Sequence, residues 1–277
     1  TAGTVAYLPK RLLDQILATN GMCAGNTAEE AIVQGLCEVM ERFALRTILV
    51  DQESAPTIPA AELRHLRSYK ILDQISKLGF SVIVKDCTLG GKVPVVCVVL
   101  LNRDRTKYRV TFGADPLLDV ALQRCLTEVT QNYDRNNIEP VMKDLRAVFA
   151  EEGVRIAKQD IHLQYIKSIL DSGGRFRQGF FFSKGRPRYR EAFLDRACPH
   201  REMLDWLVEK VHRFSRRIYL RNMSFLGFPT YHVYVPGMSE LRLLEKVGIE
   251  NHFVKKAKVR EYLLLLPKLS HRDLRNC

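Results

Sequence analysis

The stretch TNGMCAGNTAEEAIVQGLCEVMERFAL, residues 19–45, defines the most clearly marked helix of the chain. Asn26 and Thr27 are typical helix-start residues, and Glu30 completes the spacing of a capping box. Apolar residues then recur at three- and four-residue intervals: Ile32, Leu36, Val39 and Phe43. We therefore predict a helix over residues 26–50 with one apolar face toward the core.

The opposite face of this helix carries a polar stripe. Its members are spaced four residues apart, with one more glutamate beside them: Glu30, Gln34, Glu38, Arg42 and Glu41. Carboxylates along one stripe repel one another unless cations neutralise them. Arg42 supplies one positive charge, and a divalent metal would supply more. Mg²⁺ accepts one or two protein carboxylates and prefers phosphate oxygens for its other positions.

The loop before the helix contains Gly21, Gly25 and Asn26, which permit tight or left-handed backbone ahead of free helix N–H groups. A helix start of this kind binds anions. With the carboxylates and Arg42, it indicates a nucleotide–Mg²⁺ pocket. The residues also allow a plainer interpretation, in which Glu30 only caps the helix and Glu38 pairs with Arg42 on the surface.

A second polar face is predicted on a helix over residues 117–133. Arg124, Glu128 and Gln131 are spaced i, i+4, i+7 and share one face of that helix. An arginine reaching phosphate and a glutamate reaching metal would complete the pocket. The alternative is an ordinary solvated helix face.

The remaining pattern alternates between helices and strands. Further helices are predicted over residues 61–78, ended by Gly79, and over residues 201–214. Strands are predicted over residues 81–87, 93–101, 108–112, 218–221 and 230–235. Gly90 and Gly91 suit a hairpin turn between the first two strands. Hairpins mixed with helices predict an α+β fold with a largely antiparallel sheet flanked by helices.

Composition and charge exclude several classes of protein. The 277 residues are 46% hydrophobic, which is typical of a folded globular chain, and no apolar run approaches the length of a membrane span. Seven cysteines without a C-x-x-C pair argue against a disulfide framework or a zinc finger, so we expect free thiols and a cytoplasmic location.

The net charge of +12 is concentrated late in the chain. Residues 175–221 contain 13 basic and 5 acidic residues. Basic and aromatic residues alternate in RFRQGFFFSKGRPRYREAF, residues 175–193, a pattern that suits RNA phosphates with base stacking or a flexible peptide. A solvated irregular segment is the alternative.

Together, these motifs resemble the YcaO family. The resemblance is carried by TNGMCAGNTAEEA (19–31), QGLCEVMER (34–42), DCTLGGKVPVVCVVL (86–100), VTFGADPLLDVALQRCLTEVTQ (110–131) and HVYVPGMSEL (232–241). It covers most of residues 6–135 and resumes near 218–245. The sequence is most similar to the enterobacterial lineage, which is linked to thio-modification of a small-subunit ribosomal protein.

The resemblance implies a site that binds ATP and Mg²⁺ within the α+β fold. Residues expected at the nucleotide are Asn26, Arg42, Arg124 and Cys23. Residues expected to hold Mg²⁺, directly or through water, are Glu30, Glu38, Glu41 and Glu128. Within these sets, the resemblance implies that Glu38, Glu41 and Arg124 are catalytic.

The implied reaction is ATP-dependent phosphorylation of a peptide backbone amide. Attack by a neighbouring side chain then yields an azoline, as in a cyclodehydratase, and attack by sulfide yields a thioamide. The implied partners are a peptide or ribosomal-protein substrate, a partner protein for methylthiolation, and a second copy in a homodimer. The alternative is a non-enzymatic module that binds RNA or a partner through residues 175–221.

The chain departs from the family pattern in several places. An earlier block, Ser-x3-Glu-x2-Glu-Arg, would lie before Thr1, and Cys23 stands where the nearest lineage has serine. Residues 1–277 do not contain the proline-rich carboxyl end of azoline-forming members or the helical-repeat extension of the enterobacterial type. We expect residues 1–277 to be a YcaO-like domain without its amino-terminal block. Residues 1–150 would form its nucleotide and Mg²⁺ part, and residues 151–277 its basic part.

Overall fold

The computed structural model describes residues 19–50, 53–129, 142–145, 176, 178–183, 185–224 and 227–240. Asn20–Ser239 form one compact unit, and Thr1–Thr19 with Glu240–Cys277 form another. All elements named below belong to the first unit. The division predicted at residue 150 stays a prediction.

The predicted first helix is confirmed as α2, Ala28–Val50. Its start is capped by Thr27, whose Oγ1 accepts the backbone N–H of Glu30 at 3.1 Å. Leu36 and Val39 of the predicted apolar stripe are fully buried, whereas Ile32 and Phe43 are only partly buried. The polar stripe is solvated at Gln34, which is exposed, whereas Glu38 and Glu41 further along the helix are partly buried.

The described strands form two antiparallel sheets, which confirms the α+β prediction. A five-stranded sheet has the order β2 (Thr57–Ile58), β3 (Ser81–Asp86), β4 (Val95–Leu101), β5 (Lys107–Ala114) and β6 (Lys143–Asp144). A three-stranded sheet has the order β1 (Met22–Ala24), β8 (Thr230–Tyr234) and β7 (Tyr219–Asn222). The sequence pattern did not predict β1, β2 or β6, because strands of two or three residues are too short to show a period.

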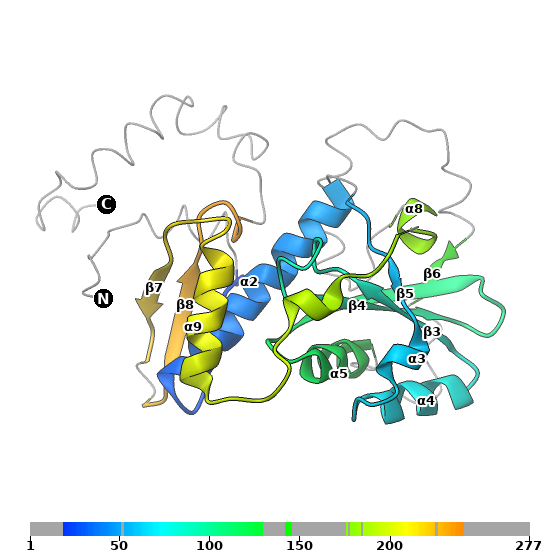
Figure 1. Ribbon diagram of the computed structural model, residues 1–277, viewed down its shortest axis with the longest axis horizontal. Helices are drawn as coiled ribbons and strands as arrows, with labels where there is room; N and C mark the ends of the chain where they lie inside the picture. The colour runs from blue at the N-terminus through cyan, green and yellow to red at the C-terminus, as the bar shows by residue number, and fades with distance from the viewer. Residues whose placement is uncertain are drawn as a thin grey trace, which may run out of the picture. The chain divides into compact units, whose positions relative to one another are not determined.

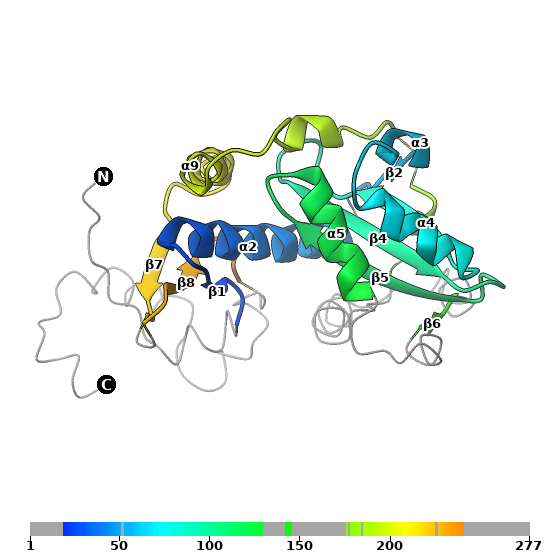
Figure 2. The same cartoon turned by 90° about the horizontal axis from the view of Figure 1, so that it is seen from below.

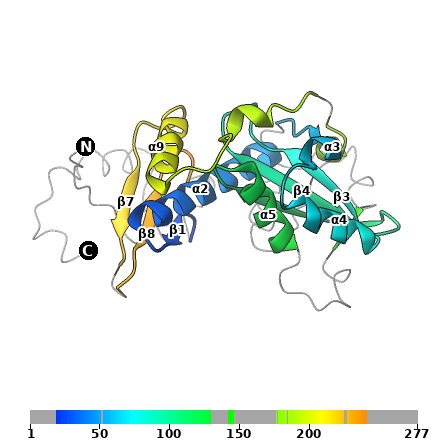
Figure 3. The same cartoon turned by 60° about the horizontal axis from the view of Figure 1, so that its bottom comes forward.

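Helices cover the sheets and connect them. Helices α4 (Tyr69–Lys77) and α5 (Leu118–Val129) lie side by side on the large sheet (Figure 2). Their apolar residues, among them Leu72 and Leu122, form a core with Val84, Val96 and Val98 of the strands. Helix α2 lies between the two sheets and contacts β1 and β8 of one and β4 and β5 of the other (Figure 1). Helix α9 (His200–Val211) packs against α2 and crosses it (Figure 3).

The single helix predicted over residues 61–78 was wrong. The segment forms α3 (Ala60–Leu63) and α4, separated by a turn. The reason is a tertiary contact at Ser68, whose backbone N–H and hydroxyl both donate to Asp119 Oδ1 on α5, at 2.8 and 2.6 Å. That N–H is therefore not available for a continuous helical ladder. The predicted end at Gly79 is confirmed, because this residue has φ +93°.

The other predicted helices and strands are confirmed with small changes at their ends. The predicted helix over residues 117–133 is α5, whose described part ends at Val129; residues 130–133, with Gln131, lie outside the described residues. Two short elements precede α9, namely α8 (Gln178–Phe181) and the 3₁₀ helix η2 (Tyr189–Ala192). No helix in the described ranges combines the length and hydropathy needed to cross a membrane.

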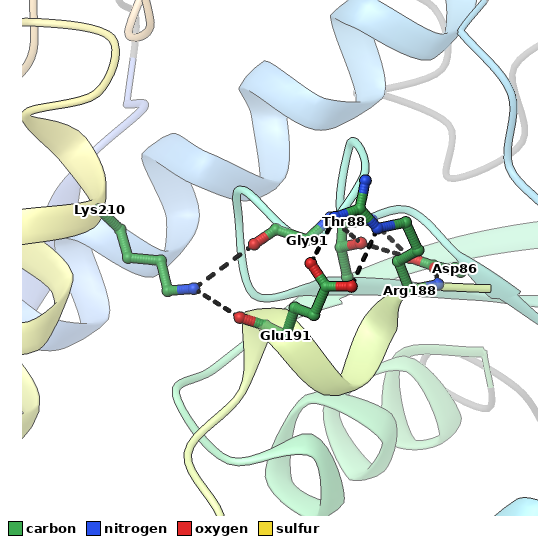
Figure 4. A network of polar contacts seen from close by, with 6 residues as sticks. All are labelled: Asp86, Thr88, Gly91, Arg188, Glu191 and Lys210. Atoms are coloured by element: carbon green, nitrogen blue, oxygen red, sulfur yellow. Dashed lines mark hydrogen bonds and ion pairs between the residues drawn. The ribbon is translucent and has the colours of Figure 1, made fainter.

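The hairpin loop between β3 and β4 is fastened to the later part of the chain by a polar network (Figure 4). Gly90 and Gly91 have positive φ, as the predicted turn requires. At the start of the loop, Asp86 accepts the backbone N–H of Arg188 at 2.6 Å. At its end, the ammonium of Lys210 on α9 donates to the carbonyls of Glu191, at 3.0 Å, and Gly91, at 3.5 Å. The network thus joins the large sheet to the segment before α9 and to α9 itself.

Candidate nucleotide and metal site

Five of the residues predicted for the site form one charged cluster. Glu38, Glu41 and Arg42 come from α2, and Arg124 and Glu128 come from α5. The structure brings them together because both helices pack on β5. Their mutual influence shows the proximity: Arg42 and Arg124 lower the pKa of Glu38 and of Glu41, while Glu128 raises both. We call these five residues the acidic cluster.

Burial disfavours the charged form of two carboxyl groups in the acidic cluster. Burial raises the pKa of Glu41 to about 8; Arg42 and Arg124 oppose this shift, and Glu128 and Glu38 add to it. Burial also raises the pKa of Glu38, against the effects of Arg42 and of a hydrogen bond from the backbone N–H of Gly21. Three carboxyl groups lie near the guanidinium groups of Arg42 and Arg124, and the guanidinium of Arg109 on β5 also lies near Glu128. Such a cluster binds a proton or a cation more readily than a lone surface glutamate does.

Asp115 is a further member of the site that the sequence reasoning did not single out. It follows β5 and is buried. Its Oδ2 lies 3.7 Å from Nη2 of Arg124, and its Oδ1 accepts the backbone N–H of Leu117 at 2.9 Å. Burial raises the pKa of Asp115, and the Leu117 N–H and then Arg124 oppose that shift. The available signal was the Asp-Pro pair directly ahead of a helix, a common helix-start pattern.

Glu30 and Asn26 lie at the start of α2. Glu30 Oε2 accepts the backbone N–H of Asn26 at 2.8 Å and its side-chain amide at 3.0 Å. Both hydrogen bonds lower the pKa of Glu30, and the one from the backbone N–H has the larger effect. The capping interpretation therefore describes the present contacts of Glu30. Its predicted role at Mg²⁺, and that of Asn26 at the nucleotide, stay predictions.

His200, at the start of α9, connects the helix start with Asp115. It lowers the pKa of both Glu30 and Asp115, although other contacts have larger effects on each. No sequence pattern linked this histidine to either carboxylate, because they are far apart in the chain. His200 therefore acts electrostatically on both carboxyl groups.

Cys23 is buried between the small sheet and α2. Its thiol donates a hydrogen bond to the carbonyl of Tyr231 on β8 at 3.4 Å. Its sulfur would lie 2.7 Å from a Cβ on residue 35, so Gly35 of α2 makes room for it. Burial raises the pKa of Cys23 to about 11, which keeps the thiol neutral at physiological pH. Its predicted contact with nucleotide is not tested by these interactions.

Gly21 determines how the chain approaches Glu38. It has φ +82°, and a Cβ here would lie 2.2 Å from the carbonyl oxygen of Val233. Its own carbonyl accepts the N–H of Val233 at 2.8 Å. Only glycine combines this backbone conformation with so close an approach. The result is a backbone N–H directed at Glu38.

The donor set fits Mg²⁺ together with phosphate better than Mg²⁺ alone. Within the described residues, no three His, Cys, Asp or Glu side chains are spaced to hold a metal ion by themselves. Mg²⁺ needs only one or two protein carboxylates when phosphate and water complete its shell. The raised pKa of Glu41 indicates a carboxylate that such a cation would stabilise.

A family description agrees with this arrangement. The family model described as "YcaO cyclodehydratase, ATP- and Mg²⁺-binding" matches residues 3–239. The chain belongs to the YcaO family. The matched range includes both helices of the acidic cluster, Asp115, and the two sheets.

Two curated relatives are similar over nearly the whole chain. An uncharacterized protein of Haemophilus influenzae is 31% identical over 266 residues, which are 96% of this chain and 43% of that protein. The ribosomal protein S12 methylthiotransferase accessory factor YcaO of Escherichia coli K12 is 30% identical over 262 residues, 94% of this chain and 43% of that protein. The chain therefore spans less than half the length of these YcaO relatives.

A solved structure supports the fold. A heterocyclase in complex with substrate and cofactor aligns with a TM-score of 0.57 and 18% identity, over 80% of this chain and 28% of its own. At this identity the likeness concerns the fold alone.

Proposed function

We propose that this chain contributes to an ATP- and Mg²⁺-dependent enzyme that activates a peptide backbone amide. The observation that carries the proposal is the acidic cluster, in which glutamates and arginines of α2 and α5 converge and burial raises the pKa of Glu38 and Glu41. The YcaO family description supports ATP and Mg²⁺ as the species that complete it.

In this proposal, each part of the cluster has a distinct task. Arg42 and Arg124 bind phosphate oxygens, with Asn26 and Cys23 nearer the helix start. Glu38, Glu41 and Glu128 hold Mg²⁺ directly or through water. Glu30 also binds Mg²⁺, after giving up part of its hydrogen bonding to Asn26. Mg²⁺, when bound, neutralises charge on the triphosphate. The residues act by positioning and electrostatics, which is the main form of catalysis in phosphoryl transfer.

The proposed reaction begins when the amide oxygen of the peptide attacks the γ-phosphorus of ATP. An oxygen–phosphorus bond forms, the bond to the β-phosphate oxygen breaks, and ADP leaves. A nucleophile then adds to the activated carbon, and inorganic phosphate leaves with the former amide oxygen. A cysteine, serine or threonine side chain as nucleophile yields an azoline, and sulfide yields a thioamide. Glu38, Glu41 and Arg124 are the proposed catalytic residues.

The name of the Escherichia coli relative suggests a biological setting for this reaction. That protein is an accessory factor of ribosomal protein S12 methylthiotransferase. By analogy we propose a ribosomal protein as peptide substrate, a methylthiotransferase as partner protein, and a cytoplasmic location. A homodimer belongs to the same proposal.

The test is ATP binding and turnover by the full chain, with S12 protein as the first candidate substrate. Glu38→Ala and Arg124→Ala should each reduce turnover about a hundredfold, the scale on which charge-stabilising groups act. Gln34→Ala and Gln123→Ala are matched controls, because these side chains are exposed on the same two helices. Unchanged ATP affinity and turnover in Glu38→Ala would remove the site assignment.

A second candidate function, RNA binding without catalysis, is favoured by the distribution of arginine. Residues 185–224 contain nine arginines, all exposed, and one lysine, which is buried. Arginine binds phosphate in a bidentate manner that lysine cannot match. Three of the nine are paired with carboxylates: Arg188 with Glu191, Arg190 with Glu62, and Arg201 with Asp205.

Of the other six arginines, Arg213, Arg216 and Arg217 lie in the turn between α9 and β7, where the RNA-binding capacity would be concentrated. Arg213 and Arg216 have no carboxylate within ion-pair distance in the described part of the chain, and the Arg217 side chain donates to the hydroxyl of Tyr219. Replacing Arg213 and Arg216 by glutamine should lower the slope of log affinity against log salt by about 1.4 for single-stranded RNA. The same change at Arg188 and Arg190 is the control for net charge. Equal slopes in both variants would exclude this turn as the RNA site.

A further inference from the structure

The carboxylate of Asp115 is held in place by the backbone around it. Its Oδ1 accepts the N–H of Leu117, and its own N–H donates to the carbonyl of Pro94 at 3.3 Å. Pro116 restricts the next backbone dihedral, and its carbonyl accepts the N–H of Leu194 at 2.9 Å. The position of Asp115 therefore does not depend on any ion pair.

The other carboxylate oxygen faces a residue of the acidic cluster. Oδ2 lies 3.7 Å from Nη2 of Arg124, whose side chain is 40% exposed against 11% for Asp115. A guanidinium has five N–H donors, and one carboxylate uses at most two of them. Arg124 thus keeps donors for a ligand on its exposed side.

Arg124 has strong competitors for its charge nearby. Its influence on the pKa of Glu38 and of Glu41 places it within reach of the carboxylates that the proposed Mg²⁺ requires. If Arg124 formed ion pairs with those glutamates, its guanidinium could not bind phosphate. The glutamates in turn could not bind the metal. An ion pair with a carboxylate that the backbone holds in place competes with this pairing.

We propose that Asp115 is a positioning residue that holds the guanidinium of Arg124 away from the glutamates of the acidic cluster and toward a phosphate of ATP. This inference rests on the proposed function, because it assumes that Arg124 meets a phosphate. Asp115 acts through Arg124 and touches neither nucleotide nor metal.

Asp115→Asn is the direct test, since asparagine keeps the oxygen that accepts from Leu117 and loses the charge that attracts Arg124. Asp119→Asn is the matched control: Asp119 lies in the first turn of α5, and its Oδ1 accepts from Ser68 instead. In the full chain, calorimetry with Mg²⁺ and a non-hydrolysable ATP analogue should show about fivefold weaker binding for Asp115→Asn, the scale of one partly exposed ion pair. The control should differ from the wild type by less than about twofold.

A double-mutant cycle separates positioning from a general structural effect. Asp115→Asn should weaken analogue binding in the wild type and have no further effect in Arg124→Ala. In the nucleotide-free protein, the effects of the two substitutions on the unfolding free energy should also be non-additive. Additive effects, or full affinity in Asp115→Asn, would overturn the role of Asp115 alone. A wild-type protein that does not bind the analogue would overturn the proposed function as well.

Discussion

Glu30 Oε2 accepts the backbone N–H of Asn26 at 2.8 Å, so one carboxylate closes the first turn of the helix that also carries the acidic cluster. The same carboxylate is proposed to bind Mg²⁺. The two roles make different demands on its charge, because a cap needs only an oxygen acceptor and a metal needs an anion.

Crossed substitutions at the start of α2 separate these roles. Glu30→Gln keeps an acceptor for Asn26, so the unfolding free energy should change less than in Thr27→Ala, while Mg²⁺-dependent ATP affinity falls. Thr27→Ala should lower the unfolding free energy by about 1 kcal/mol and leave ATP affinity unchanged, because it removes only the cap to the Glu30 N–H. Urea unfolding and calorimetry on both variants measure the two effects. Unchanged ATP affinity in Glu30→Gln would show that Glu30 caps the helix and does not bind Mg²⁺.

The raised pKa of Glu41 predicts how the stability of the nucleotide-free protein depends on pH. The pKa rises from 4.5 to about 8 on folding, so the folded state holds this proton more tightly than the unfolded state does. The resulting stabilisation is complete below pH 4.5 and is lost as the pH rises through about 8. Glu41→Gln should therefore raise the melting temperature at about pH 8.5 by roughly 2–4 °C for each kcal/mol of repulsion removed.

Magnesium provides the control for this pH effect. Mg²⁺ should raise the melting temperature of the wild type at alkaline pH, because it binds the folded state, and should do so less in Glu41→Gln. Differential scanning calorimetry across pH 5–9, roughly the range over which this carboxyl titrates, measures both effects. A variant with the same pH profile as the wild type would show that Glu41 titrates normally.

Glycine at position 21 is predicted to be indispensable. Gly21→Ala adds a Cβ that meets the Val233 carbonyl oxygen at 2.2 Å, in addition to the strain of φ +82°. Gly237→Ala isolates the strain, since Gly237 has φ +85° and nothing within 4 Å of the added carbon. We expect a loss of about 1–2 kcal/mol for Gly237→Ala and more than about 4 kcal/mol for Gly21→Ala in urea unfolding. Similar losses in both variants would contradict the close approach of β1 to β8.

Lys210 is predicted to stabilise the junction of α9 with the β3–β4 hairpin. It donates to the carbonyls of Glu191 and Gly91, and its ammonium lies 4.5 Å from the ring centroid of Trp206. Lys210→Met leaves buried carbonyls without this donor and should cost about 1–3 kcal/mol. Arg213→Met, an exposed change three residues later, should cost less than about 0.5 kcal/mol. Thermal unfolding of the two variants is the measurement.

Strong local patterns were sufficient for much of the fold. The helix α2 was predictable because its cap and apolar period lie within one continuous stretch, and β3, β4 and β5 because β-branched runs flank clear turn residues. The break between α3 and α4 was not predictable, because it depends on Asp119, which is 51 residues from Ser68. Strand β1 was missed because its three residues are too few to show a period, and its partner β8 lies more than 200 residues later.

For the candidate site too, some features were predictable from local sequence and others depend on tertiary packing. Spacing on each helix put Glu38 and Arg42 on one face and Arg124 and Glu128 on another, since helical periodicity is a local property. That the two faces meet beside β5, that burial raises the pKa of Glu41 to about 8, and that Asp115 adjoins Arg124 follow from how distant elements pack. Local order can be read from neighbouring residues, whereas desolvation and charge pairing depend on residues brought close only when the chain folds.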